Sequence, residues 1–377
     1  MKGTKPVAYS KPLADRVRRL LARESDVGEY EESGLIFLVQ GHMCCHVVGD
    51  ELMVWVGVVA LEDALSQPNV EFVPTTRTMR GTIRVAAKGI EEDRDLAEWV
   101  GRGLTFVHSI RPRWGVSLPK IGFGTWTIGG RSDPDPSRDE WSLAALRSAL
   151  DLGYTHFDTA EMYAGGHAET LLGQAIRESG VERDSLLITS KVLPSNLTSD
   201  GVLAACEGSL RRLGMDYLDL YLIHWPVDGM RLGESFDALN RLVDEGKVRH
   251  LGVSNFDRYL LQRAQRLSAT PLVTNQVPYS FNNRSYVDNG VVAYCQANDI
   301  LVTAYSPVEE GRLTANPALI EIAAAHNATP YQIALAWLVQ QAGVVTIPMS
   351  ASPAHQAQNL AAADIRLCAE ELALLGM

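Results

Sequence analysis

Residues 218–226 read Leu-Asp-Leu-Tyr-Leu-Ile-His-Trp-Pro, a short and mostly apolar run that ends on a histidine and a tryptophan. A nearly continuous apolar run of this length is typical of a strand in a parallel sheet that is covered on both faces. Similar runs recur every ~20 to 40 residues with amphipathic stretches between them, which is the spacing of βα units. The predicted strands are 121–125, 155–158, 186–190, 218–224, 250–253, 273–276, 301–305 and 344–347.

Helical segments fit between these strands, for example at 141–152, 202–213, 236–245 and 332–341. Eight βα units within ~260 residues match the length of a (β/α)8 barrel. The sequence therefore predicts an α/β fold, with a (β/α)8 TIM barrel over residues 115–377. An open, doubly wound sheet is the structural alternative.

The first 112 residues have a different pattern and predict a small α+β domain. Residues 11–23 place apolar side chains on one helical face, with arginines opposite. Short strand-like runs follow at 34–39, 43–48 and 52–56, with Gly49-Asp50 as a tight turn between the last two. A second helix is predicted at 93–107, and the proline and glycine within 109–116 indicate a junction to the barrel.

Composition and charge narrow the class of protein. The chain has 377 residues, 46% of them hydrophobic, and a formal charge of −11. Residues 1–113 carry 15 basic and 16 acidic groups, and the remainder carries 19 and 29, so neither part has the basic excess of a nucleic-acid binder. No apolar run is long enough to span a membrane, and the N-terminus lacks the apolar segment of a secretory signal. With only five cysteines, we expect a cytoplasmic protein with reduced thiols and no nucleic-acid or membrane partner.

Polar residues follow the predicted barrel strands at the end where barrel active sites lie. They are Asp158 and Tyr163 after the second strand, Lys191 after the third, His224 after the fourth, Ser254 and Asn255 after the fifth, Gln276 after the sixth, and Tyr305 and Ser306 after the seventh. A single tyrosine or histidine at a strand end is more often a packed or solvated residue. A phenol, an ammonium, a carboxylate and an imidazole at consecutive strand ends form a coherent proton-transfer group.

Seven motifs at these strand ends carry a resemblance to a known family. They are GFGTW (122–126), FDTAEMY (157–163), ITSKV (188–192), LYLIHWP (220–226), GVSNF (252–256), NQVPY (275–279) and AYSP (304–307). From about residue 117 onward the sequence resembles the aldo-keto reductase family, and within it the bacterial methylglyoxal reductase and diketogluconate reductase branch. The resemblance implies NAD(P)H-dependent reduction of a carbonyl on a (β/α)8 barrel.

The resemblance also implies roles for four residues. Tyr163 matches the proton donor, Lys191 and Asp158 match its electrostatic partners, and His224 matches the imidazole that orients the carbonyl. Chemistry supports these roles, because hydride addition to a carbonyl carbon places negative charge on the oxygen, which must then be protonated. We expect the Lys191 ammonium to lower the pKa of the Tyr163 phenol. Trp126 and Trp225 are expected to form apolar walls of the substrate pocket.

The cofactor residues follow from the same resemblance, because a Rossmann G-x-G-x-x-G motif is absent. Ser254, Asn255 and Gln276 match ligands of the nicotinamide carboxamide, Tyr305 matches the residue that stacks on its ring, and Ser306 and Ser350 are expected near phosphates. Thr125, Trp126, Pro307, Ile347 and Asn359 complete the predicted cofactor site. Met349 and His355 stand where NADPH-preferring members have a lysine and an arginine. NADP(H) is favoured, with NAD(H) as the alternative.

Residues 1–112 resemble the N-terminal domain family of TfoX, a competence regulator. The resemblance rests on the stretch GLIFLVQGHMCCHVVGDELMVWVG (34–57), on RTMRG (77–81) and on DLAEWVGRGLTF (95–106). It implies a small binding or regulatory module. On a regular strand His42, Cys44 and His46 would share one face and Cys45 the other. A second cluster of ligands and C-x-x-C spacing are both absent, so we expect a packed cysteine strand and no metal.

The first functional hypothesis is a reductase of small aldehydes and ketones, such as methylglyoxal-like dicarbonyls. The alternative is a nicotinamide-sensing module that signals through the N-terminal domain to a protein partner. An intact proton-transfer group favours the enzyme. Because the chain stops at Met377, straight after a helix-like segment, we expect an open substrate pocket with broad specificity.

Overall fold

The computed structural model describes residues 9–22, 24, 27–31, 33–39, 42–73, 81–109, 118–313 and 316–376. The chain divides into two compact units, Met1–Ser117 and Leu118–Met377. Each unit has its own cluster of buried apolar side chains. Among the residues described, no helix is long and apolar enough to cross a membrane.

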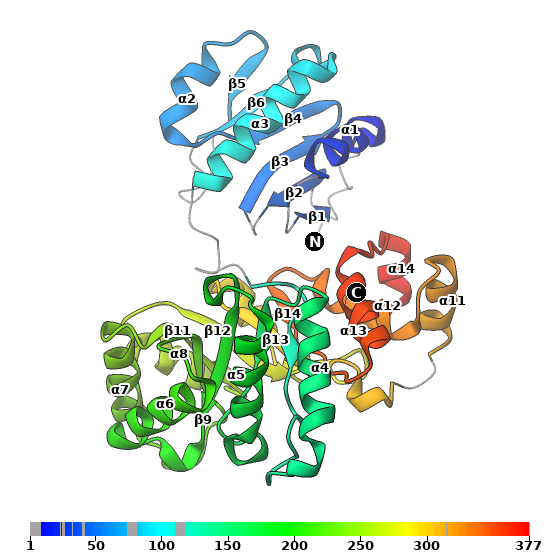
Figure 1. Ribbon diagram of the computed structural model, residues 1–377. Helices are drawn as coiled ribbons and strands as arrows, with labels where there is room; N and C mark the ends of the chain where they lie inside the picture. Colours follow the sequence, from blue (N-terminus) through cyan, green and yellow to red (C-terminus); the bar gives the residue numbers. More distant parts are fainter. Residues whose placement is uncertain are drawn as a thin grey trace. The chain divides into compact units, whose positions relative to one another are not determined.

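The first unit is a six-stranded antiparallel sheet with helices. Its elements are α1 (Lys11–Leu21), β1 (Val27–Glu31), β2 (Leu35–Val39), β3 (His42–Val48), β4 (Glu51–Trp55), α2 (Gly57–Leu65), β5 (Val70–Phe72), β6 (Thr82–Val85), the 3-10 turn Ala87–Ile90 and α3 (Asp93–Ser109). The strand order is β1-β2-β3-β4-β6-β5. Helix α3 packs against β3, β4 and α1 (Figure 1). Burial alternates along β2, and its buried side chains Leu35, Phe37 and Val39 form part of the hydrophobic core on the face of the sheet.

The predicted elements of this unit are present with small shifts at their ends, and β1, α2, β5 and β6 were not predicted. Strand β3 departs from the expected alternation. Its pairing with β2 shifts register, so that Phe37 lies opposite Cys45 while Leu38 lies opposite Met43. Cys44 is therefore the extra residue of a β-bulge, and both Cys44 and Cys45 are buried. The regular alternation that would place His42, Cys44 and His46 on one face and Cys45 on the other is therefore interrupted at this bulge.

The second unit contains eight parallel strands, each followed by one or more helical segments. The strands are β7 (Phe123–Gly124), β8 (His156–Asp158), β9 (Leu187–Val192), β10 (Leu218–Ile223), β11 (Val248–Ser254), β12 (Leu272–Pro278), β13 (Leu301–Tyr305) and β14 (Val344–Thr346). The helices are α4 (Asp139–Asp151), α5 (His167–Ser179), α6 (Ser199–Leu213), α7 (Leu232–Asp244), α8 (Arg258–Leu267), α9 (Ser285–Asp288), α10 (Val291–Ala297), α11 (Pro317–Ala325), α12 (Pro330–Val339), α13 (Pro353–Ala361) and α14 (Ala369–Leu374).

The sheet of the second unit closes on itself. Its strands follow in chain order from β7 to β14, and all neighbours pair in parallel. Ile121 then forms a parallel bridge with Thr346, and the Gly122 N–H donates to the Thr346 carbonyl at 2.8 Å. This contact joins the first strand region to the last, so the fold is a (β/α)8 barrel, as predicted, and the open doubly wound sheet is excluded (Figure 1).

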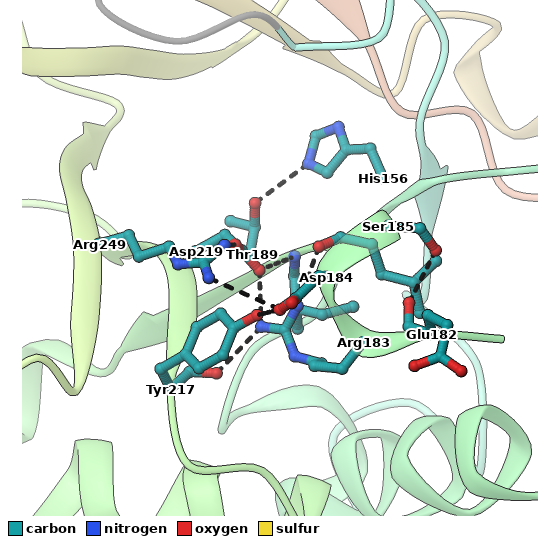
Figure 2. A network of polar contacts seen from close by, with 11 residues as sticks. His156, Glu182, Arg183, Asp184, Ser185, Thr189, Tyr217, Asp219 and Arg249 are labelled. Atoms are coloured by element: carbon teal, nitrogen blue, oxygen red, sulfur yellow. Dashed lines mark hydrogen bonds and ion pairs between the residues drawn. The ribbon is translucent and has the colours of Figure 1, made fainter.

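A polar network holds the amino ends of three barrel strands together (Figure 2). The Asp219 carboxylate accepts hydrogen bonds from Arg183 at 2.6 Å, from Arg249 at 2.9 Å and from the backbone N–H of Ile188 at 3.0 Å. Both guanidinium groups also lie against the Tyr217 ring, 4.1 and 3.9 Å from its centroid. We assign this network a role in barrel stability. It lies at the amino ends of the strands, whereas the chemistry of such barrels takes place at the opposite, carboxyl ends.

Candidate active site

Lys191 is the centre of the predicted proton-transfer group. It lies within β9, rather than after it as predicted, and is fully buried. Its Nζ donates to Asp158 Oδ1 at 2.5 Å, to the Thr159 carbonyl at 2.9 Å and to Tyr163 Oη at 3.0 Å. Burial disfavours the charged ammonium, but Asp158 and Tyr163 outweigh it, and the pKa of Lys191 is raised. Lys191 is therefore a charged group whose three N–H bonds all have acceptors.

Tyr163 follows β8 in a short 3-10 turn, and its ring packs edge-on against Trp126 with centroids 5.2 Å apart. Because its Oη already accepts a hydrogen bond from Lys191, its own proton points elsewhere and is available to a ligand. Burial raises the pKa of Tyr163, and the nearby Lys191 charge only partly opposes this effect. Lys191 does lower the pKa of the phenol, as predicted, but desolvation outweighs it, so the pKa of Tyr163 is raised overall. The phenol is protonated near neutral pH.

His224 directly follows β10 and lies beside the phenol. Its ring centroid is 5.7 Å from that of Tyr163 and 4.6 Å from that of Trp225. Burial, and then the charge of Lys191, lower the pKa of His224 to about 2. The imidazole is therefore neutral and carries one N–H that it can donate to a ligand oxygen. Trp126 packs against Tyr163 and Trp225 against His224, and their role as apolar walls of a substrate pocket stays a prediction.

Amide and hydroxyl side chains form a second cluster next to this group. Asn255, in a left-handed conformation with φ of 60°, donates to Ser254 Oγ and accepts from the Tyr305 phenol, both at 3.0 Å. Ser254 Oγ donates to the Gln276 carbonyl at 2.8 Å, and Gln276 Nε2 donates to Asp158 Oδ2 at 2.7 Å. The structure thus brings Ser254, Asn255, Gln276 and Tyr305 together beside the catalytic candidates. Amide and hydroxyl groups of this kind suit a ligand carboxamide.

The other predicted cofactor residues follow β7, β13 and β14 in the chain, most of them on loops and two of them, His355 and Asn359, in helix α13. Thr125 is buried and donates its hydroxyl to the Asp158 carbonyl at 3.0 Å, so its side chain braces β8. Met349 accepts a weak hydrogen bond from Thr127 at 3.8 Å, and Asn359 contacts the Tyr154 phenol. Pro307 and Ile347 are buried, Ser350 is half-buried, and His355 is exposed in the first turn of α13.

Ser306 lies at the edge of a surface hollow of about 330 Å³. It is exposed, and its φ of 51° is left-handed. The other lining residues are Asn282, Asn283, Glu309, Glu310 and Arg312. None of the four catalytic candidates lines this hollow.

Two contacts at the site were not predicted. The Thr159 backbone carbonyl is an acceptor for Lys191, and Gln276 bonds to Asp158. A backbone acceptor leaves no signal in residue type, and the second contact joins residues that are far apart in the sequence. In the part of the chain that the structure describes, no group of three or more His, Cys, Asp or Glu side chains is arranged to hold a metal ion.

The fold and the site together define the class of this protein. A buried ammonium that positions a phenol beside a neutral imidazole, at the carboxyl end of a (β/α)8 barrel, is the acid–base arrangement of a barrel enzyme. Residues 120–376 match the Aldo/keto reductase family. The chain belongs to the aldo/keto reductase family.

Comparison with known proteins gives several relatives of the second unit. The chain is 41% identical over 266 residues to methylglyoxal reductase YeaE of Escherichia coli K12, which covers 69% of this chain and 90% of that protein. It is 36% identical to methylglyoxal reductase DkgB of Salmonella typhi, over 68% of this chain and 91% of that protein.

Solved structures show the same relationship. The thermostable aldo-keto reductase Tm1743 superposes with a TM-score of 0.67 at 45% identity, covering 69% of this chain and 95% of its own. An aldo/keto reductase from Klebsiella pneumoniae, solved with NADP and acetate, has a TM-score of 0.63 at 41% identity and covers 69% of this chain and 91% of its own. The family assignment made from the strand-end motifs is confirmed.

Proposed function

We propose that this chain reduces small aldehydes and ketones to alcohols with NADPH, and that dicarbonyls such as methylglyoxal are among its substrates. The contact between Lys191 Nζ and Tyr163 Oη carries the proposal, because it prepares a phenol to give up its proton beside a neutral imidazole. The two relatives called methylglyoxal reductases support the substrate class. The Klebsiella pneumoniae relative, solved with NADP, supports the cofactor.

The reduced nicotinamide supplies the hydride, and the chain's own residues manage the oxygen of the carbonyl. The neutral His224 donates an N–H to that oxygen and so orients the carbonyl. As negative charge develops on the oxygen, Tyr163 donates its phenolic proton. Lys191, held by Asp158 and the Thr159 carbonyl, stabilises the phenolate that remains. Trp126 and Trp225 exclude water from the reacting groups.

The residues at the barrel mouth fit a nicotinamide cofactor. Ser254, Asn255 and Gln276 offer hydroxyl and amide groups for a carboxamide, and the Tyr305 ring offers an aromatic face. Ser306, Pro307, Ile347, Ser350 and Asn359 are proposed to contact the rest of the cofactor. Met349 and His355 provide no permanent cation for a 2′-phosphate, so NAD(H) is the competing cofactor.

For the first unit we propose a TfoX-like module over residues 1–112, joined to the reductase barrel at 115–377. Its antiparallel sheet backed by α1 and α3 is compatible with a binding module that contacts a partner protein. We propose a cytoplasmic location, which the five free cysteines support. The complete Asp158–Lys191–Tyr163 group favours catalysis over a barrel that only senses nicotinamide.

The proposed activity is tested by following NADPH oxidation with methylglyoxal in the purified full chain. The matched control is Tyr163→Phe, which keeps the ring and removes the proton donor. We expect the variant to bind NADPH and to lose kcat by at least about 100-fold, since general acid catalysis contributes on the order of 10² or more. Equal rates in the two proteins would contradict the proposal.

A further inference from the structure

The Asp158 carboxylate has a second hydrogen bond that the acid–base chemistry above does not use. Its Oδ1 accepts from Lys191, while its Oδ2 accepts from the side-chain amide of Gln276 at 2.7 Å. Gln276 lies on β12, and Asp158 ends β8, so the contact crosses the inside of the barrel. The two side chains belong to residues only 3% and 1% exposed. Water therefore does not replace this bond when it is lost.

We propose that Gln276 is a positioning residue, whose amide N–H fixes the Asp158 carboxylate so that Lys191 stays directed at Tyr163. This inference rests on the proposed reductase function. It adds to the carboxamide contact that the family resemblance implies for Gln276. That contact can use the amide oxygen or the second N–H, whereas the bond to Asp158 uses one N–H, so a single side chain can serve both.

The geometry explains why one bond to the carboxylate is insufficient. A carboxylate held at one oxygen can turn about its terminal bond, because that torsion is broad. Lys191 has no spare N–H, since its three donors reach Asp158, Thr159 and Tyr163. A turn of Asp158 would therefore move the ammonium away from the phenol. The bond from Gln276 to the other oxygen prevents this turn.

Gln276 is itself held in place by its neighbours. Its backbone carbonyl accepts hydrogen bonds from the Ser254 hydroxyl at 2.8 Å and from the Asn255 N–H at 2.9 Å. The pairing of β12 with β11 therefore fixes the backbone of Gln276, from which its side-chain amide extends. The charges that shift the pKa of the phenol are those of Lys191 on β9 and Asp158 on β8. The other titratable groups nearby are His224 after β10 and Tyr305 of β13, with His156 of β8 close to Asp158 and Lys191, and both imidazoles are neutral near pH 7.

Three variants of the full chain test the proposal. Gln276→Met removes the donor at similar size. Gln276→Glu replaces it by a carboxyl that can donate to Asp158 only when protonated. Gln340→Met is the control, because Gln340 is a partly buried glutamine that bonds to the backbone of Leu367, outside the proposed site. The measurements are the pH profile of kcat with NADPH and methylglyoxal, and the NADPH Kd from quenching of protein fluorescence.

We expect Gln276→Met to lower kcat about ten-fold or more at every pH, because a hydrogen bond to a buried charged group is lost. Its NADPH Kd is expected to change by only a few-fold. Gln276→Glu is expected to retain kcat at acid pH and to lose it as pH rises, since two neighbouring carboxyl groups share a proton and then repel. Gln340→Met is expected to match the unmodified protein in both measurements.

A different result is expected if Gln276 serves only the cofactor carboxamide. An ionised carboxylate accepts from a carboxamide N–H, so Gln276→Glu would then work at least as well at high pH, and the main loss in Gln276→Met would be in NADPH Kd. Either result would overturn the proposal.

The cofactor-free protein gives an independent measurement. In Gln276→Glu the carboxyl beside Asp158 should have a raised pKa, so its folded state binds an extra proton. As the pH rises from 5 to 8, the stability of this variant relative to the unmodified protein should therefore decrease. A constant difference would contradict the contact to Asp158. If the unmodified chain oxidises no NADPH with any small carbonyl, the proposed function fails, while this measurement still decides whether the contact exists.

Discussion

His156 gives the barrel a measurable sensitivity to acid, because it is held neutral inside the fold. It is the first residue of β8 and is 1% exposed. Its Nε2 lies 3.0 Å from the Thr189 hydroxyl, and its Nδ1 has no hydrogen-bond partner among the described residues (Figure 2). Burial lowers the pKa of His156 to about 4, from an ordinary value of 6.5.

The sign of the effect follows from proton binding in the two states. Between pH 6.5 and pH 4 the unfolded chain protonates this histidine and the folded chain does not. Stability conferred by the neutral His156 is therefore complete above about pH 6.5 and decreases as the pH falls. One pKa unit corresponds to about 1.4 kcal/mol, so the difference between the two pKa values predicts a loss of about 3 kcal/mol on reaching pH 4.

The assay compares the unmodified full chain with His156→Leu by urea unfolding at pH 7.5, 5.5 and 4. At pH 7.5 the variant should be the less stable protein, because the Thr189 hydroxyl loses its partner. On going to pH 4 the variant should gain about 3 kcal/mol relative to the unmodified chain. His224 titrates in both proteins and cancels in the comparison. Parallel stability curves over this pH range would refute the assignment of a buried neutral His156.

Three further outcomes follow from the same structure. Lys191→Met should raise the pKa of Tyr163 further and so move the pH profile of alcohol oxidation to more alkaline pH. It should also destabilise the fold by about 3–5 kcal/mol, because the Asp158 charge is left buried and unpaired. pH–rate profiles and urea unfolding measure the two effects, and an unshifted profile would contradict the first. Asp219→Asn should cost about 2–4 kcal/mol of stability by weakening the pairs with two arginines, with kcat unchanged, because it lies at the amino end of the strands; a large loss of kcat in folded protein would argue against the structural role. Met349→Lys should lower the NADPH Kd about ten-fold at low salt and leave the NADH Kd unchanged; equal effects on the two cofactors in a fluorescence titration would mean that residue 349 does not meet the 2′-phosphate.

The local pattern of the sequence was enough to predict the barrel and its proton-transfer group. Apolar runs such as residues 218–224 need two covered faces, which only a parallel sheet with outer helices provides. In such a sheet the carboxyl ends of the strands meet at one rim, so Asp158, Tyr163, Lys191 and His224 could be grouped from their places after or at the ends of strands. Register and burial of single residues were less predictable, as the bulge at Cys44 shows.

The tertiary structure decided which distant residues are in contact and how the loss of solvent changes the pKa values of buried groups. Closure of the sheet through Ile121 and Thr346 excluded the open alternative, and the contact between Gln276 and Asp158 joined two strands that are not neighbours in the sheet. The net direction of the Tyr163 pKa was decided there as well. Lys191 lowers this pKa, as the sequence predicted, but the loss of water around the phenol, which a sequence does not show, raises it by more. Desolvation and long-range contacts arise only when distant segments pack together, and so the sequence pattern alone carries no measure of them.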